Sequence, residues 1–175
     1  MALIFLLAVA LALMRAKPFE KLPFIGGYKP LVVLGGSMEP AIKVGSVVLV
    51  RKVEPSHIKV GDIITFRVPL EAGQLVNGER PIVTHRVIDV SRQKGLLTVK
   101  TEGDANENAD NWKITEHDVM GQAKFYIPYF GYLSHYVRKP VGFILLVIVP
   151  GLLIMLIEIR KILLQIRLAR GTVDA

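Results

Sequence analysis

Ile82-Val83-Thr84-His85-Arg86-Val87-Ile88-Asp89-Val90 alternates apolar and polar side chains, which is the pattern of a β-strand with one buried face. A turn at Gly95 follows, and Leu96-Leu97-Thr98-Val99-Lys100 is a second strand-like run. Two such runs joined by a short turn that contains glycine predict a β-hairpin. The hairpin indicates a β-rich domain in the middle of the chain.

Three further short runs around the hairpin have the composition of strands. They cover residues 46–50, 62–68 and 119–127, and the first two are rich in β-branched side chains. We find no convincing helix between residues 18 and 128, and residues 70–81 read as one long polar loop. We therefore expect a mainly β fold, with one all-β domain over residues 18–138.

The most apolar segments lie at the two ends of the 175-residue chain, whose mean hydropathy is +0.44. Residues 1–14 and 141–157 carry no charge. At 1.5 Å per residue they reach about 21 Å and about 26 Å, against a hydrocarbon core of about 30 Å. We expect a transmembrane helix over 139–159 and an N-terminal membrane anchor over 1–17 whose natural start lies at or upstream of Met1. A cleaved signal peptide is the competing interpretation of the first segment.

The net charge of +7 comes largely from basic residues beside the apolar ends. This distribution favours a lipid surface rather than a nucleic acid as the partner. Residues 160–175 have amphipathic helical spacing, so we expect the helix to continue into this basic tail along the membrane surface. The positive-inside rule places the tail in the cytoplasm and the β domain on the extracytoplasmic side.

Gly36-Ser37-Met38-Glu39-Pro40 places an unhindered hydroxyl between glycines and a proline. Taken alone, this pentapeptide is more typical of an ordinary turn. A serine becomes a nucleophile only when a base removes its proton and a third group orients the base. His85 and the acidic stretch Glu102–Asp110 supply those two residue types in that order. The chain has no cysteine, which excludes thiolate catalysis and disulfides.

Four motifs in sequence order make the chain resemble the type I signal peptidase family over roughly residues 31–130. They are Gly36–Pro40, Gly61–Phe66, Thr84–Val87, and Glu102–Asn106 running to Asp110. The bacterial branch of this family carries a lysine at the position of His85, whereas the archaeal and endoplasmic-reticulum branch carries a histidine. The chain is similar to the second branch. The resemblance implies a membrane-anchored β-fold serine endopeptidase that removes signal peptides from exported preproteins.

The resemblance also implies a role for each site residue. Ser37 attacks the scissile carbonyl, His85 takes and returns the proton, and Asp110 orients the imidazole, while Asp104 is the supporting acidic residue. Asp104 is the alternative candidate for the orienting role. The backbone N–H of Ser37 can stabilise the oxyanion. Bacterial relatives often add a serine hydroxyl two residues before the nucleophile, where this chain has Gly35, so a second oxyanion donor stays unidentified.

The expected substrate is an extended peptide that presents its cleavage site beside the membrane, where it can add to a strand edge. Small substrate residues before the cut would fit shallow apolar pockets, for which Met38, Ile82 and Val83 are the candidates. The expected partners are preprotein signal peptides, the lipid bilayer and the secretion translocon, without nucleic acid, metal or another cofactor. The expected location is the cell membrane, or the endoplasmic reticulum membrane in a eukaryote.

Two other functions compete with this hypothesis. A catalytically inactive membrane-tethered β-domain could bind peptides or assemble a complex, but an intact Ser, His and Asp set disfavours it. A self-cleaving regulatory protease would need a sensor or DNA-binding segment that we do not find. Lys43 and Lys52 are alternative bases, which we interpret as solvated charges at strand ends. The ligand-type residues Glu116-His117-Asp118 are adjacent and point different ways, so we expect no metal site there.

Overall fold

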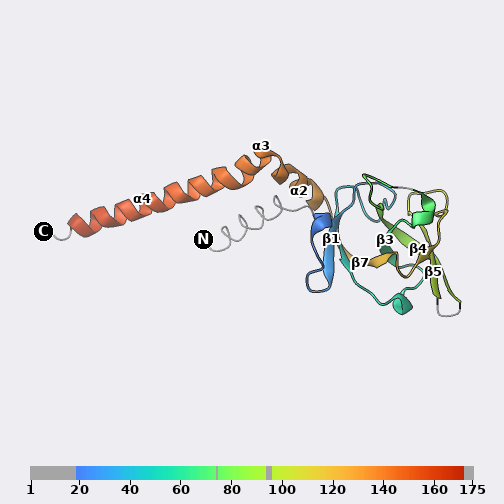
Figure 1. Ribbon diagram of the computed structural model, residues 1–175. Helices are drawn as coiled ribbons and strands as arrows, with labels where there is room; N and C mark the ends of the chain where they lie inside the picture. The colour runs from blue at the N-terminus through green and yellow to red at the C-terminus, as the bar shows by residue number, and fades with distance from the viewer. Residues whose placement is uncertain (1–18, 74, 94–95, 172–175) are drawn as a thin grey trace. The chain divides into compact units, whose positions relative to one another are not determined.

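The computed structural model describes residues 19–73, 75–93 and 96–171, and the expected N-terminal anchor over 1–17 lies outside them (Figure 1). The chain divides into two compact units. One is Pro18–Tyr132, which carries the sheet, and the other includes Leu133–Ala175, which carries the helices.

The first unit is built on one seven-stranded antiparallel sheet, which confirms the predicted mainly β class (Figure 1). The strands are β1 (Tyr28–Val32), β2 (Val47–Arg51), β3 (Ile63–Arg67), β4 (Ile82–Gln93), β5 (Leu96–Glu102), β6 (Ile114–Thr115) and β7 (Val119–Ile127). Their order across the sheet is β1-β2-β7-β3-β4-β5-β6. The last strand in sequence, β7, therefore lies between β2 and β3.

The predicted hairpin is β4 paired with β5, from Arg86↔Glu102 to Gln93↔Leu96, with a register shift between Val87 and Asp89. β4 is longer than predicted because it continues to Gln93. Two strands were not predicted. β1 contains Pro30, which cannot donate a ladder hydrogen bond and is tolerated here because β1 is an edge strand. β6 has only two residues.

Short 3₁₀ turns occupy three connections of this unit, and no α-helix occurs in its described residues before Ile127. They are η1 (Phe19–Lys21), η2 (Pro55–His57) and η3 (Leu70–Ala72). The last of these opens the polar loop predicted for 70–81.

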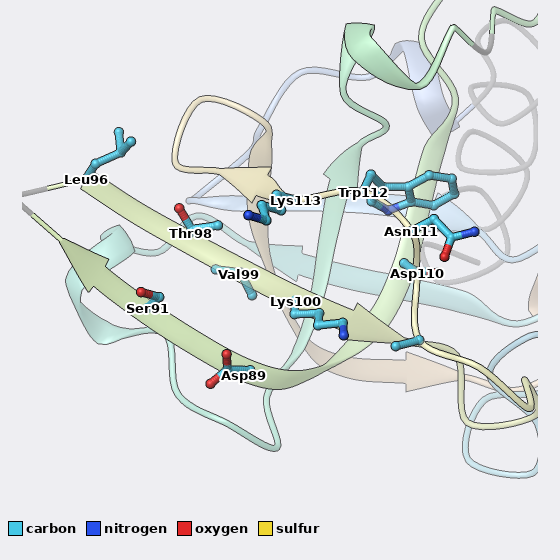
Figure 2. A pocket seen from close by; sticks show the side chains of 11 residues that line it. Asp89, Ser91, Leu96, Thr98, Val99, Lys100, Asp110, Asn111, Trp112 and Lys113 are labelled. Atoms are coloured by element: carbon cyan, nitrogen blue, oxygen red, sulfur yellow. The ribbon is translucent and has the colours of Figure 1, made fainter.

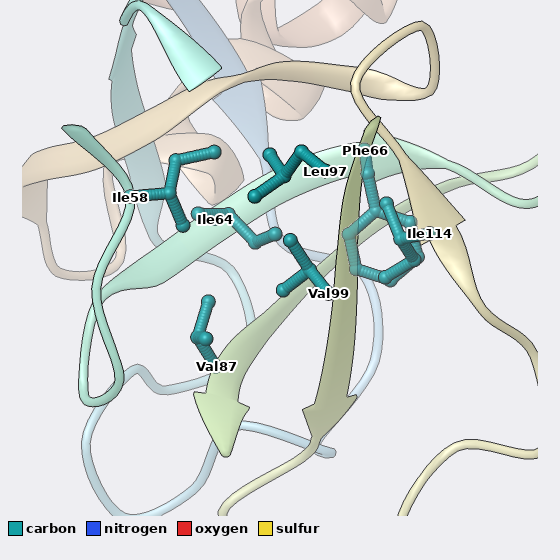
Figure 3. Packing of buried hydrophobic residues seen from close by; sticks show 7 residues of the cluster. All are labelled: Ile58, Ile64, Phe66, Val87, Leu97, Val99 and Ile114. Atoms are coloured by element: carbon teal, nitrogen blue, oxygen red, sulfur yellow. The ribbon is translucent and has the colours of Figure 1, made fainter. Parts of the chain in front are cut away.

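The main core cluster joins both sides of the hairpin to β3 (Figure 3). Alternate residues of a strand point to one face of the sheet, and Ile64 with Phe66 on β3 and Leu97 with Val99 on β5 follow this rule, each at most 4% exposed. The cluster consists of Ile58, Ile64, Phe66, Val87, Leu97, Val99 and Ile114. Each such side chain contributes about 1.5–3 kcal/mol when it leaves water. This burial fixes β4, the strand that carries His85.

A second core cluster holds the loop between β1 and β2. Met38 and Ile42 come from that loop and are 1% and 2% exposed. They pack with Leu31, Val48 and Val50 of the two strands. The loop that carries Ser37 is therefore anchored to the sheet by its own side chains.

The second unit consists of consecutive helical segments, which are α2 (Phe130–Arg138, beginning in the first unit), α3 (Pro140–Phe143), the π-helical η4 (Ile144–Ile148) and α4 (Val149–Gly171). The sequence did not predict α2. In η4, the backbone N–H of Val149 donates to the carbonyl of Ile144. This wider turn ends two residues before Pro150, which has no N–H to donate.

One helical stretch in the described part of the chain, Pro140–Ile166, is long and apolar enough to cross a membrane. Its most apolar 18-residue window has a mean hydropathy of 2.8. α4 continues to Gly171, as the spacing of the basic tail predicted. The span predicted over 139–159 thus coincides with the first part of this stretch.

Candidate active site

Ser37 lies in a tight turn of the β1–β2 loop. The backbone N–H of Glu39 donates to the carbonyl of Gly36 at 3.0 Å, and that of Ile42 donates to the carbonyl of Met38 at 2.8 Å. Gly36 is exposed and Met38 is buried, so Ser37 stands at the boundary between the core and solvent, half-buried. The Ser37 hydroxyl is therefore accessible, and these hydrogen bonds fix the backbone that carries it.

His85 of β4 lies between Ser37 and Asp110. Its Nε2 atom is 3.0 Å from Ser37 Oγ, and its Nδ1 atom is 2.7 Å from Asp110 Oδ2. The histidine is 5% exposed, and its ring meets the Phe66 ring edge to face at a centroid distance of 6.3 Å. A hydroxyl, an imidazole and a carboxylate in this order form the hydrogen-bonded chain that a serine nucleophile requires.

Asp110 belongs to the acidic loop, which we define as residues 103–113 between β5 and β6. The backbone N–H of Asp110 donates to the carbonyl of Thr101 at 2.8 Å. The hydroxyl of Thr101 donates to Asp110 Oδ2 at 2.5 Å. The side chains of His85 and Asp110 are each 7% exposed, so their contact is shielded from water.

Asp104 does not contact His85 but is held by Arg86. The guanidinium donates from Nε and Nη2 to the two carboxylate oxygens of Asp104 at 2.8 and 2.7 Å. It also donates to the carbonyl of Gly61 at 3.1 Å. The hydrogen bond to Asp104 raises the pKa of Arg86 above its usual value, although burial opposes the shift. The pair ties the acidic loop to β4.

The acidic loop also packs directly on the backbone of Ser37. The N–H of Ala105 donates to the carbonyl of Ser37 at 2.9 Å. A Cβ atom at Gly103 would lie 2.6 Å from the same carbonyl oxygen and 2.8 Å from Asn106 Nδ2. Only a glycine at position 103 lets the acidic loop come this close to the Ser37 carbonyl without displacement. The close contact therefore explains why this position of the motif is a glycine.

A cleft of about 470 Å³ opens beside Ser37. It is lined by residues 31–35, 37 and 38, by Val48, and by residues 76, 77 and 79–84. The three residues expected from sequence to form substrate pockets, Met38, Ile82 and Val83, all lie on this cleft. Met38 is buried beneath it, whereas Ile82 is 38% exposed.

Arg80 secures one wall of the cleft, and sequence reasoning did not single it out. Its Nε donates to the carbonyl of Val68 at 2.7 Å, and its Nη2 pairs with Asp118. Asp118 also accepts hydrogen bonds from the N–H and the hydroxyl of Thr115 at 3.0 and 2.7 Å. Burial alone would raise the pKa of Asp118, but the hydrogen bonds from Thr115 and Arg80 outweigh burial and lower it.

A separate cavity of about 540 Å³ lies along the β4–β5 hairpin and the end of the acidic loop (Figure 2). Asp89, Lys100, Trp112 and Lys113 are among its lining residues. Asp110 also lines it, whereas Ser37 and His85 do not. Its charged groups have both signs, and nothing in its lining repeats the chemistry of the Ser37 cleft.

The other sequence candidates lie apart from this site. Lys43 Nζ is 5.9 Å from the centre of the Tyr129 ring, and Lys52 is exposed. His117 is exposed, and its neighbour Asp118 is engaged by Arg80. In the described ranges, no three His, Asp or Glu side chains are grouped to hold a metal ion.

Comparison of the sequence with known proteins identifies the family of the chain that carries this site. The family model described as "Signal peptidase, peptidase S26" matches residues 1–94, a range that includes Ser37 and His85. Signal peptidase I W of Bacillus subtilis (strain 168) is 35% identical over 101 residues, which are 57% of this chain and 48% of that protein.

The signal peptidase complex catalytic subunits SEC11C of Homo sapiens and Mus musculus are each 33% identical over 119 residues, 62% of this chain and 57% of theirs. The matched part is therefore about half the length of these curated relatives. Because the family model covers more than half of the chain and relatives from a bacterium and from mammals agree with it, the chain belongs to the signal peptidase family.

Proposed function

We propose that this protein is a membrane-anchored serine endopeptidase that cleaves signal peptides from preproteins. The single observation that carries the proposal is the hydrogen-bonded chain from Ser37 Oγ through His85 to Asp110 Oδ2, with distances of 3.0 and 2.7 Å. Family membership supports the same reaction, because the similar proteins bear the name signal peptidase.

In the proposed mechanism, His85 donates its Nδ1–H to Asp110 and accepts the Ser37 proton at Nε2. Ser37 Oγ then attacks the scissile carbonyl carbon, and the resulting oxyanion accepts a hydrogen bond from the Ser37 N–H. The imidazolium returns its proton to the leaving amine, which frees the mature protein. A water molecule, deprotonated by His85, hydrolyses the acyl-enzyme and regenerates the Ser37 hydroxyl.

The cleft beside Ser37 suits an extended peptide with small apolar residues before the cut. Its volume of about 470 Å³ is open toward Ser37, and Met38, Ile82 and Val83 present aliphatic or thioether surface to it. Large side chains would have to displace the buried Met38, which is 1% exposed. We therefore assign substrate contact to these three residues.

We assign membrane attachment to the helical stretch Pro140–Ile166 and to the N-terminal segment over 1–17. The stretch has the length and hydropathy of a membrane span. Basic residues after residue 159 favour a cytoplasmic tail and an extracytoplasmic β domain over 18–138. The proposed partners are signal peptides, the bilayer and, for delivery of preproteins, the translocon.

The test compares the full-length protein with Ser37→Ala in detergent and in lipid vesicles, using a preprotein as substrate. The expected result is cleavage at the end of the signal peptide by the wild type and none by Ser37→Ala. If the wild type binds the preprotein but cleaves it under no lipid condition, the inactive peptide-binding module is the correct function.

A further inference from the structure

Thr101 is a buried polar residue in an otherwise apolar row of β5. Leu97, Val99 and Thr101 alternate along the strand and are buried, and Thr101 is 0% exposed. Its partner on the neighbouring strand β4 is Val87, which belongs to the main core cluster. A valine of similar shape would continue this core, whereas a buried hydroxyl without a partner destabilises the fold. The buried Thr101 hydroxyl therefore needs a specific hydrogen-bond partner.

That partner is the carboxylate of Asp110. Thr101 Oγ1 donates to Asp110 Oδ2 at 2.5 Å, and the Thr101 carbonyl accepts the Asp110 N–H at 2.8 Å. The same Oδ2 atom lies 2.7 Å from His85 Nδ1. One threonine thus holds both the main chain and the side chain of Asp110, and one carboxylate oxygen receives the hydroxyl and the imidazole together.

We propose that Thr101 is a positioning residue of the proposed Ser37-His85-Asp110 triad. The terminal torsion of an aspartate has a broad energy well, so the main-chain bond alone leaves the carboxylate free to turn. The Thr101 hydroxyl fixes that torsion with Oδ2 toward His85. The fixed carboxylate keeps the imidazole aligned with Ser37. This inference rests on the proposed function, because it needs the triad to work.

The first test compares Thr101→Val, which keeps the shape but removes the donor, with Thr101→Ser, which keeps the donor. Thr98→Val is the matched control on the same strand, at a partly buried position out of phase with the apolar row. Thr101→Val is expected to lower kcat about 10- to 100-fold with KM nearly unchanged. Thr101→Ser should recover kcat to within about 3-fold of the wild type. The control Thr98→Val should have the kcat of the wild type.

The second test asks whether Thr101 acts through Asp110. In single-turnover cleavage, the double variant Thr101→Val/Asp110→Asn should be no slower than Asp110→Asn alone, because residues that act as one unit are not additive. A purely structural role would slow both backgrounds equally. Circular dichroism and Tm of each variant verify that the fold is retained.

The proposal is overturned if Thr101→Val keeps wild-type kcat, if Thr101→Ser is as slow as Thr101→Val, or if the two losses add in the double variant. Each of these results presupposes that the wild type cleaves and Ser37→Ala does not. Loss of that difference would instead contradict the proposed function itself, so the two failures are distinguishable.

Discussion

Arg86 binds both carboxylate oxygens of Asp104, at 2.8 and 2.7 Å. Arg86 directly follows His85 in β4, and adjacent residues of a strand point to opposite faces. The ion pair therefore fastens the acidic loop to β4 without entering the contact between His85 and Asp110. The two aspartates of the loop consequently have different structural partners, which gives their substitutions different expected effects.

Asp110→Asn should lower preprotein cleavage far more than Asp104→Asn does. An amide at position 110 can stabilise the wrong imidazole tautomer and cannot balance an imidazolium, an effect of about 10⁴-fold in serine-protease triads. Asp104→Asn weakens a partly exposed ion pair and should cost about 1 kcal/mol of stability with a mild loss of rate. Initial rates on one substrate decide between them. If Asp104→Asn is inactive and Asp110→Asn is active, the orienting aspartate is Asp104 and the assignment of Asp110 is wrong.

Ser37→Ala and His85→Ala should each abolish processing while the fold persists. Ser37 is half-buried in a loop, and the sheet depends on the apolar clusters instead. Exposed Ser56→Ala and His117→Ala are the matched controls and should cleave like the wild type. Processing is measured by gel shift of the preprotein, and the fold by circular dichroism. Retained cleavage by either site variant refutes the triad.

His85→Lys should give little or no activity, although lysine is the base in the bacterial branch. A lysine base must be neutral to accept a proton. Asp110, which lies 2.7 Å from His85 Nδ1, would instead favour the ammonium form of a lysine placed there. Turnover at neutral pH is the measurement, and near-normal rates for this variant would contradict the electrostatic argument.

Gly103→Ala should reduce both activity and stability. The added Cβ would lie 2.6 Å from the Ser37 carbonyl oxygen, so the acidic loop and the β1–β2 loop must separate. Overpacking of this kind typically costs about 1–3 kcal/mol. Urea unfolding and kcat report the two effects. Gly151→Ala is the control, because a Cβ there meets nothing within 4 Å. If both variants have the same kcat and urea midpoint, the contact between Gly103 and the Ser37 carbonyl is not tight.

The Asp118 cluster should make stability depend on acid pH. Because the pKa of Asp118 is lowered below its ordinary value of 3.8, its contribution is fully present above that value. It is lost as the pH falls through the lower folded pKa. The urea midpoint of the wild type should therefore exceed that of Asp118→Asn at pH 7, and the gap should shrink below a pH of about 4. Exposed Asp89→Asn is the control. A gap that is constant with pH would contradict the assignment.

Local pattern was enough to predict most of the sheet. Apolar and polar alternation predicted the β4–β5 hairpin, β-branched runs predicted β2 and β3, and a further strand-like run predicted β7. β1 escaped prediction because Pro30 lowers its strand character, and only its pairing with β2 reveals it. The strand order was beyond reach for the same reason, since pairings between distant segments leave no trace in local periodicity.

The candidate site was partly predictable, because three side-chain types in a known motif order suggested it. The choice between Asp104 and Asp110 depends on which carboxylate Arg86 neutralises, and sequence spacing does not contain that information. Thr101 gave one faint signal, a hydroxyl in an apolar strand row. Arg80 gave none, since an arginine in a polar loop is ordinary.

β7 connects the two parts of the sheet that carry the candidate site residues. Ser37 belongs to the part of the sheet with β1 and β2, whereas His85 and Asp110 belong to the part with β3, β4 and β5. Among the described strands, β7, the last in sequence, is the one that pairs with both β2 and β3. A nascent chain that ends before Val119 holds all three side chains but has no strand to join them. The sheet order therefore makes the last strand of the β unit a requirement for joining the part that carries Ser37 to the part that carries His85 and Asp110 in one sheet.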